Sequence, residues 1–431
     1  MGAMTTTAPA PHAATVLCGP ARSDLVRAAV GLPAGVDVEV RVERVQHRGD
    51  GTSVGYDVRY GTPDGDATTT RAADYLVAST APAALAAGAT SGVVRVSDGE
   101  LDVALWRHPG DPALPGLSAS CDLATVATWL PGTTRLEMVT YRPLRRAVVR
   151  ALGPGGVTGY VKVVRPTHAD RLERQHVATA ALGSPRVLAR PGPGVLVLAD
   201  VAGRTLVEAI AAGDRAPDLA ELLALLERSD PSALGEPAVE PFSLGLTAQV
   251  AALDGALDAP TAARLHRLAD AAQAWIARTV RAWPLVVTHG DLHAGNLVVS
   301  APNGRVEVAG VLDVDRVGPG HRVDDLACLL AHLSINGIRP DVGARCDGDG
   351  DLEAAAERAR ATVERWWSQV ADPAPAAART ASVVLSLVGV VEPARVPALL
   401  DLAGAWCTRA STPNAPLHRG GGGSAPPSEE S

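Results

Sequence analysis

Lysine is almost absent from this sequence of 431 residues. Lys162 is the only one, and the rest of the 39 Lys and Arg residues are arginine. Asparagine is nearly as rare, and Phe242 is the only phenylalanine. A G+C-rich coding sequence produces this bias, because the codons for Lys, Asn, Phe and Ile are rich in A and T. The bias therefore says little about the fold, but it raises the question of why a lysine is kept at position 162.

The cysteines lack the spacing of a disulfide framework or a zinc site. They are five in number, widely separated, and contain no C-x-x-C pair, which favours free thiols in a reducing cytoplasm. Residues 1–10 contain no basic region followed by an apolar core, so no secretory signal is predicted. No apolar run reaches the length of about 18 residues that a membrane span needs. We therefore expect a cytoplasmic location and no membrane partner.

Net positive charge is also missing. The formal net charge of -8 argues against non-specific binding to nucleic acids or anionic membranes. Hydrophobic residues make up 47% of the chain and charged residues 20%, as in ordinary globular proteins, so we expect a large core and two or three domains.

The first 120 residues show the period-two alternation of half-buried strands. Apolar residues alternate with polar ones over 36–42 and 54–60, and 68–79 is strand-like. Residues 93–96 and 101–106 flank an Asp98-Gly99 turn, which is typical of a hairpin. A short helix is predicted over 22–30, before these strands. Residues 1–120 are thus predicted to form a small, mostly antiparallel α+β unit.

Two further segments follow. Strands are predicted over 137–141, 146–150 and 159–164, a helix over 170–182 and a buried strand over 195–201, which together give a unit over 121–201. Residues 202–415 are rich in helical patterns, at 218–227, 259–282, 352–370 and 376–391. A strand-rich island at 285–313, with an Asn303-Gly304 turn, interrupts them. The Gly-, Pro- and Ser-rich residues 416–431 are predicted to be a disordered tail.

The island contains the strongest chemical signal of the chain. His289-Gly290-Asp291 is followed by Asn296, and Asp313 comes 17 positions later. Phosphoryl transfer needs a carboxylate to orient and deprotonate the attacking hydroxyl, oxygen ligands for magnesium, and a cation on the phosphates. Asp291 suits the first role, and Asn296 and Asp313 offer an amide oxygen and a carboxylate for the second.

This pattern resembles the aminoglycoside phosphotransferase and choline kinase branch of the protein-kinase-like fold. The motif H-G-D-x-x-x-x-N, the D-x-D at Asp313 and the D-L-A at Asp325 occur in the order and spacing of that family, and the resemblance covers residues 137–406. It implies an α+β fold with a small antiparallel β lobe and a helical large lobe, to which the N-terminal unit would add a mostly β cap, and it implies the cofactors ATP and Mg²⁺.

The resemblance also gives the single lysine a role. In this fold a lysine on the third strand of the small lobe binds the α- and β-phosphates, and Lys162 stands on such a strand. A planar guanidinium does not replace a compact ammonium there. The family expects a helix Glu as its partner. Glu173 is the candidate, although the family's spacing falls on Gln175.

Nucleotide contacts are likewise implied by the resemblance. The backbone around Ala199 and Val201 matches the hinge that binds adenine, although any buried strand is similar. No kinase-type Gly-rich phosphate loop is found, and Leu130–Thr134 is the predicted replacement, with a plain turn as the alternative.

Several other residues have competing interpretations. His289 is predicted to support the loop through a hydrogen bond, and Asp325 to cap a helix over 325–333 and bond the loop backbone, with Asp324 as a rival cap. His293 is expected to be structural or exposed, and Asp315 a solvated carboxylate or a metal or substrate contact. The acidic run at 347–351 favours a solvated loop over a calcium site. Trp366 and Trp367 suit the core or a groove wall, with a substrate pocket as the other option.

The N-terminal unit resembles the cap of some actinobacterial sugar kinases, maltokinase-like enzymes among them, and residues 106–117 resemble a signature of actinobacterial phosphotransferases. A dimerisation or packing module is the alternative. The chain is thus expected to be an ATP- and Mg²⁺-dependent O-phosphotransferase for a hydroxyl of a sugar, amino sugar or aminoglycoside-like antibiotic, as a monomer or homodimer. The alternatives are an inactive nucleotide-binding regulatory module and a protein kinase. Gly290 and the absence of D-F-G and A-P-E oppose the second of these.

Overall fold

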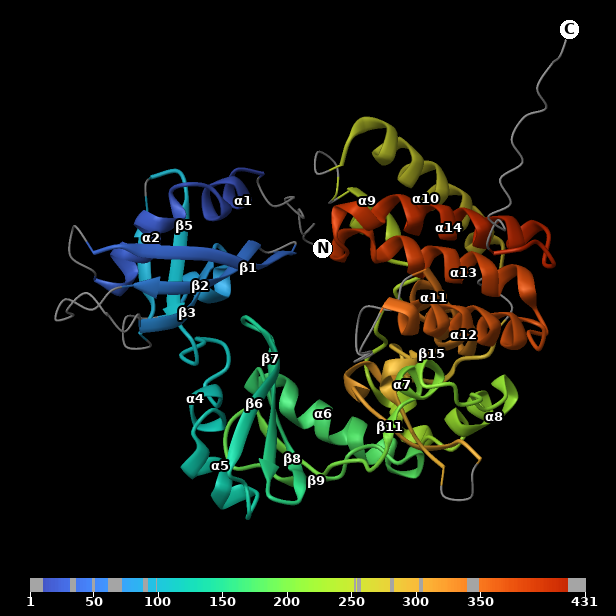
Figure 1. Cartoon of the computed structure of the whole chain (residues 1–431), viewed down its shortest axis with the longest axis horizontal. Coiled ribbons are helices and arrows are strands. Elements are labelled where there is room, and N and C mark those ends of the chain that lie inside the picture. The colour runs from blue at the N-terminus through green and yellow to red at the C-terminus, as the bar shows by residue number, and fades with distance from the viewer. Residues whose placement is uncertain are drawn as a thin grey trace, which may run out of the picture. The chain divides into compact units, whose positions relative to one another are not determined.

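The computed structural model divides the chain into two compact units (Figure 1). The first comprises Met1–Glu173 with Arg186–Asp200, and the second Arg174–Pro185 with Val201–Ser431. The four-segment division into 1–120, 121–201, 202–415 and 416–431 stays a prediction. The structure describes residues 11–31, 36–48, 51–60, 72–87, 92–97, 99–251, 253, 257–279, 283–301, 305–338 and 349–417.

The first unit contains two antiparallel sheets. The N-terminal sheet has the order β1-β2-β3-β5-β4, and its strands are β1 Val38–Arg48, β2 Gly51–Tyr60, β3 Ala72–Ser79, β4 Val94–Ser97 and β5 Asp102–Arg107. The helices α1 Pro11–Cys18 and α2 Arg22–Val30 precede them, and α3 Pro82–Leu85 follows β3. The alternating patterns thus form strands as predicted, because successive side chains of a strand point to opposite faces of the sheet. Asp98, of the predicted turn, lies outside the described residues.

The second sheet of this unit positions Lys162. Its order is β6-β7-β8-β10-β9, and its strands are β6 Arg135–Arg142, β7 Arg146–Gly153, β8 Gly156–Val164, β9 Val187–Ala189 and β10 Val195–Leu198. The helices α4 Leu117–Ser120 and α5 Leu123–Trp129 precede β6, and α6 Pro166–Ala178 follows β8. Buried side chains of both sheets, including Val77, Trp106, Val149 and Val161, form one continuous cluster. The N-terminal sheet therefore shares a core with the sheet that holds the lysine.

A buried polar network lies between these sheets. Trp106 Nε1 donates to the Tyr141 hydroxyl at 3.1 Å, and that hydroxyl donates to Asp111 Oδ2 at 2.7 Å. The same carboxylate oxygen accepts from the Leu144 N–H at 2.8 Å. Burial raises the pKa of Asp111, and these hydrogen bonds partly oppose the rise. Residues 106–117 therefore hold the turn between β6 and β7 in place, through the hydrogen bond from Leu144 to Asp111.

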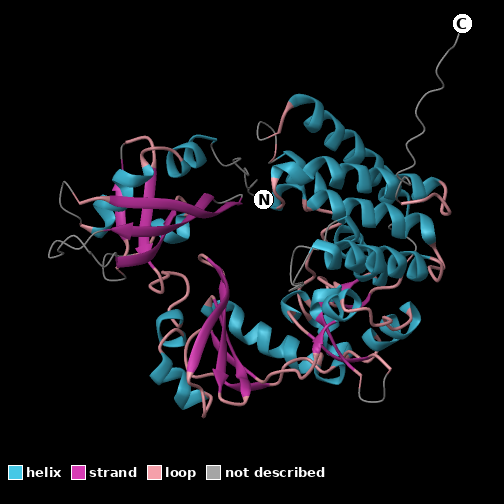
Figure 2. Cartoon of the chain, in the orientation of Figure 1, coloured by secondary structure: helices cyan, strands magenta, loops and turns pink. Residues whose placement is uncertain are grey.

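The second unit is mainly helical (Figure 2). Its helices are α7 Leu206–Ala211, α8 Leu219–Leu226, α9 Leu246–Ala251, α10 Ala259–Thr279, α11 Arg322–Ile338, α12 Asp349–Trp367, α13 Pro373–Ser386 and α14 Val396–Ser411. The helix α13 packs against α10, α11 and α14. Trp366 and Trp367 are buried, and Trp367 meets Trp406 edge to face at 5.0 Å, so the tryptophan pair belongs to the core. Among the described residues, no helix is long and apolar enough to cross a membrane.

Two small sheets interrupt the helices and hold the island. One has the order β11-β13-β14, formed by β11 Arg204–Thr205, β13 Leu297–Ser300 and β14 Glu307–Val311. The other pairs β12 Val286–Thr288 with β15 Gly318–Gly320. The predicted turn at Asn303-Gly304, residues 347–348 of the acidic run and the tail from 418 onward lie outside the described residues. Asp349 and Asp351 lie in the first turn of α12 and not in a loop.

Candidate active site

Asp291 lies on the loop between β12 and β13. The loop ends in a short 3₁₀ turn, η4 Ala294–Asn296. The Asn296 side-chain N–H donates to the Asp291 carbonyl at 2.9 Å, and the Asn296 backbone N–H donates to the His293 carbonyl at 2.8 Å. These bonds close the loop on itself and hold the Asp291 backbone in place.

Glycine at position 290 is required by the geometry of the loop. Its φ is +76°, a conformation that side chains disfavour, and an added Cβ would lie 2.8 Å from the Arg316 carbonyl oxygen. Arg316 Nε donates to the Gly290 carbonyl at 3.0 Å, and its guanidinium lies 4.1 Å from the centre of the Phe242 ring. The H-G-D sequence is therefore the form of the motif that fits against the Arg316 backbone.

Asp325 anchors the loop from α11. Its carboxylate is buried and accepts from the backbone N–H groups of His289, at 3.1 Å, and Gly290, at 2.9 Å. Arg322 lies 3.1 Å away. Burial raises the pKa of Asp325, and His289, the loop N–H groups and Arg322 oppose the rise. The predicted cap is wrong, because α11 begins at Arg322 and Asp325 lies inside its first turn, whereas the predicted bonds to the loop backbone are confirmed.

The His289 ring joins the loop to the next hairpin. Its Nε2 lies 2.9 Å from the Leu312 carbonyl, and its Nδ1 accepts from the Asp291 N–H at 3.3 Å. The ring is buried, and with both nitrogens bonded to backbone it acts as a support.

Asn296 and Asp313 come together through the β13–β14 hairpin. The Leu312 N–H donates to the Asn296 carbonyl at 2.8 Å, which places Asp313 directly beyond the loop's end. Asp313 has φ and ψ of +53°, a left-handed conformation that costs about 1–3 kcal/mol in a residue with a side chain. Since the Asn296 N–H₂ is bonded to the loop, its amide oxygen is the group left to face a cation. An amide oxygen and a carboxylate are the ligands that Mg²⁺ prefers, so these residues fit the ion.

Gln175 holds the segment after Asp313. Its side-chain N–H₂ donates to the carbonyls of Asp315, at 3.0 Å, and Val317, at 2.9 Å. Glu173, the predicted lysine partner, pairs with Arg190 at 2.9 Å on the surface of the first unit. The pairing of Glu173 with Lys162 stays a prediction.

Lys162 lies in the middle strand of its sheet. On β8 it pairs with Val148 of β7 and Leu196 of β10, and it is only 5% exposed. A lysine is rarely buried unless its ammonium has a partner. Lys162 and Ala199 belong to the first unit, and Val201 begins the second unit's main segment. The Ala199 N–H donates to the Arg186 carbonyl at 2.9 Å, so an adenine base would have to use other backbone groups nearby.

The turn between β6 and β7 lies at the lysine's end of the sheet. Arg146, the first residue after the turn, pairs with Val164 of β8, two residues beyond Lys162. Leu130–Thr134 lies at the other end of the sheet, where the Thr134 N–H donates to the Leu152 carbonyl. Along β7, Leu152 lies about 13 Å from Val148, the residue that pairs with Lys162. The register therefore contradicts the prediction for Leu130–Thr134, because a lysine and a loop that bind the same phosphates must share one end of the sheet.

Two residues beside Asp291 were not predicted from the sequence. Cys328 Sγ lies 3.8 Å from Asp291 Oδ1, and donor atoms of Asp291, Cys328 and His332 lie within 4.8 Å of one another. The His332 ring stacks on His293 with centres 4.7 Å apart. Asp325, Cys328 and His332 are spaced three and four residues apart on α11, which places them on one face of the helix. That spacing was the available signal.

His332 makes stability depend on pH. Burial, with help from His293, lowers the pKa of His332 from 6.5 to about 3. Since the folded pKa is the lower one, the unfolded chain takes up a proton first, and stability that is complete above pH 6.5 falls toward pH 3. We expect His332 to cost about 2 kcal/mol of the free energy of unfolding between pH 7 and pH 5. Urea unfolding of His332→Gln should show a shallower pH dependence than the wild type, and equal slopes would contradict this.

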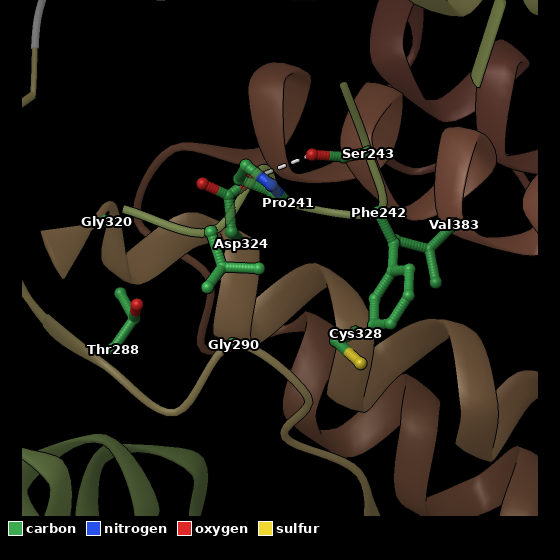
Figure 3. A pocket seen from close by; sticks show the side chains of 10 residues that line it. Pro241, Phe242, Ser243, Thr288, Gly290, Gly320, Asp324, Cys328 and Val383 are labelled. Carbon is green, nitrogen blue, oxygen red and sulfur yellow. Dashed lines mark hydrogen bonds between the residues drawn. The ribbon is translucent and has the colours of Figure 1, made fainter. Parts of the chain in front are cut away.

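A pocket lies behind the loop (Figure 3). The residues that line it include Phe242, Ser243, Thr288, Gly290, Asp324, Cys328 and Val383. Ser243 donates to Asp324 Oδ1 at 2.8 Å, and the buried Arg379 contacts the same oxygen at 2.5 Å. Asp324 is therefore a partner of a buried arginine and does not cap α11.

Comparison with known proteins gives one family. The model of the phosphotransferase enzyme family matches residues 146–363. A search of curated proteins finds no match.

Similar solved structures include a choline/ethanolamine kinase family protein from Mesorhizobium loti, at 19% identity and TM-score 0.42 over 68% of this chain and 93% of that one. Aminoglycoside phosphotransferase APH(3'')-Id from Streptomyces rimosus matches at 20% identity and TM-score 0.37, over 62% and 98%. A thermostable mutant of aminoglycoside phosphotransferase APH(4)-Ia, in complex with ADP and hygromycin B, matches at 15% and TM-score 0.43, over 68% and 98%.

Proposed function

The chain belongs to the phosphotransferase enzyme family, and on this basis we propose that it is an ATP- and Mg²⁺-dependent O-phosphotransferase acting on a hydroxyl of a small molecule. The observation that carries the proposal is the loop from His289 to Asn296, which is closed by its own hydrogen bonds and anchored by the buried Asp325. A loop held from several sides keeps Asp291 in a fixed position. Phosphoryl transfer requires this, because its catalysis depends on how the reacting groups are positioned.

In the proposed reaction Asp291 accepts the proton of the acceptor hydroxyl. The hydroxyl oxygen then forms a bond to the γ-phosphorus as the bond to the β,γ-bridging oxygen breaks, and ADP leaves. Asn296 and Asp313 would hold Mg²⁺, which when bound offsets the negative charge of the phosphates. Lys162 would bind the α- and β-phosphates, and the backbone near Ala199 and Val201 the adenine base.

A sugar, amino sugar or aminoglycoside-like antibiotic is the proposed acceptor class, and the acidic net charge suits a cationic acceptor only weakly. The need for ATP and the free thiols Cys18, Cys121, Cys328 and Cys407 support a cytoplasmic location. The maltokinase-like cap and the monomeric or homodimeric state stay predictions.

An acceptor screen tests this function. Purified full-length protein is incubated with MgATP, or MgGTP in parallel, and with sugars, amino sugars, aminoglycosides and amino alcohols, while release of nucleoside diphosphate is followed. We expect release that depends on both the acceptor and the magnesium. Magnesium-dependent nucleotide binding without turnover on any acceptor would favour the inactive regulatory module instead. Labelling of protein in a lysate, with no small-molecule turnover, would favour a protein kinase.

A further inference from the structure

Asp291, Cys328 and His332 form a group of metal-ligating side chains, of which the proposed phosphoryl transfer uses only Asp291. One donor atom of each lies within 4.8 Å of the other two, and Cys328 Sγ is 3.8 Å from Asp291 Oδ1. Cys328 and His332 are four residues apart on α11, so they stand one above the other on the helix face that meets the loop. All three lie in the second unit.

The donor set selects the kind of ion. Thiolate, imidazole and carboxylate are zinc ligands, and three protein ligands with an open fourth position is the arrangement of accessible zinc sites. Mg²⁺ prefers oxygen and does not compete for sulfur. Bonds of about 2.0–2.3 Å place tetrahedral ligand atoms about 3.3–3.8 Å apart. The distance from Cys328 Sγ to Asp291 Oδ1 already fits, and the largest separation needs to shorten by about 1 Å, which is within reach of a side-chain rotation.

Cys328 also borders a pocket. Together with Gly290 it lines the pocket behind the catalytic loop, and its side chain is otherwise buried (Figure 3).

We propose that Asp291, Cys328 and His332 bind one Zn²⁺ ion, and that this ion inhibits phosphoryl transfer by occupying the carboxylate that would receive the hydroxyl proton. The site itself stands on geometry, whereas the inhibition rests on the proposed function. When zinc binds, the Cys328 S–H bond breaks, the proton leaves to water and a sulfur–zinc bond forms. No electron is transferred.

Cobalt serves as the probe of the site. Co²⁺ is titrated into full-length protein without magnesium, nucleotide or acceptor, and the near-ultraviolet thiolate-to-cobalt absorption is recorded. We expect one equivalent to produce the band and Zn²⁺ to abolish it. Cys328→Ser should remove the band, His332→Gln should weaken Zn²⁺ binding by at least about tenfold, and the control Cys121→Ser should change neither. No band in the wild type, or the same band in Cys328→Ser, would overturn the site. Circular dichroism checks that each variant is folded, and His332→Gln keeps the test valid if Cys328→Ser does not fold.

Inhibition is measured separately with an acceptor found by the screen. Zn²⁺ should lower the turnover of the wild type, and His332→Gln should need at least about tenfold more Zn²⁺ for the same loss relative to its own zinc-free rate. A cobalt band with turnover that Zn²⁺ leaves unchanged would overturn the inhibition. A cobalt band without turnover on any acceptor supports the metal site and counts against the proposed function, so the two failures are distinguishable.

Discussion

Asp291→Asn is expected to lower kcat by about 10²–10⁴-fold while nucleotide binding is retained. The amide has nearly the shape of the carboxylate but cannot accept the proton of the acceptor hydroxyl. The loop should keep its geometry, because Asn296 bonds to the Asp291 carbonyl and His289 accepts from its N–H, and neither bond involves the side chain. Turnover is measured at saturating acceptor, and nucleotide affinity by calorimetry.

Asp401→Asn is the matched control. Asp401 lies on α14 with a side chain 72% exposed, paired with Arg264 on the surface. This change should leave kcat unaltered, because a surface ion pair contributes little to the stability of the fold. If Asp291→Asn kept the wild-type rate, Asp291 would not be the base. If it lost nucleotide binding as well, its role would be structural.

The fold was predictable where local pattern decides structure. The α+β kinase-like class, with an antiparallel small-lobe sheet and a helical large lobe, is confirmed by the strand order and the family. The strands of the N-terminal sheet follow from the alternation of apolar and polar residues along the chain. The start of α11 was misplaced because the capping rule favours Asp at a helix start, whereas β15 ends at Gly320 and the helix begins directly after it.

The site was predictable only within its contiguous motif. His289 to Asn296 share one loop, so their spacing alone indicates what they can do. Gln175 contacts Asp315 across 140 residues, and no local pattern predicts that contact. The turn beside Lys162 was missed because strand register, and not composition, decides which turn lies at which end of a sheet.

A role for Lys162 was predictable from the sequence, but its partner was not. Codon bias and motif order were sufficient to give Lys162 a predicted role, and the structure places it buried in the middle strand. Its partner could not be chosen from the sequence, because Glu173 and Gln175 lie within one helical turn. The structure gives the Glu173 side chain to Arg190 and the Gln175 side chain to the segment after Asp313.

Asp325→Ala is expected to lower the free energy of unfolding by about 2–5 kcal/mol and to reduce kcat together with it. The carboxylate is 1% exposed and accepts two backbone N–H groups of the loop as well as Arg322. Removing it leaves the His289 and Gly290 N–H groups and the Arg322 guanidinium without their acceptor. Stability is measured by urea unfolding, with the surface variant Asp401→Ala as the control.

Measuring both kcat and the free energy of unfolding distinguishes a residue that anchors the loop from one that takes part in the reaction. Asp291→Asn changes kcat and leaves the unfolding free energy nearly constant, whereas Asp325→Ala should change both, because the His289 and Gly290 N–H groups are what fix the Asp291 backbone. Asp325→Asn should be intermediate, since its amide keeps one acceptor oxygen but turns an N–H₂ group toward a backbone donor. An Asp325→Ala protein as stable as the wild type would show that the loop does not depend on α11. Loss of stability with full kcat, measured where the variant is folded, would show that Asp291 is positioned by the bonds from Asn296 and His289 alone.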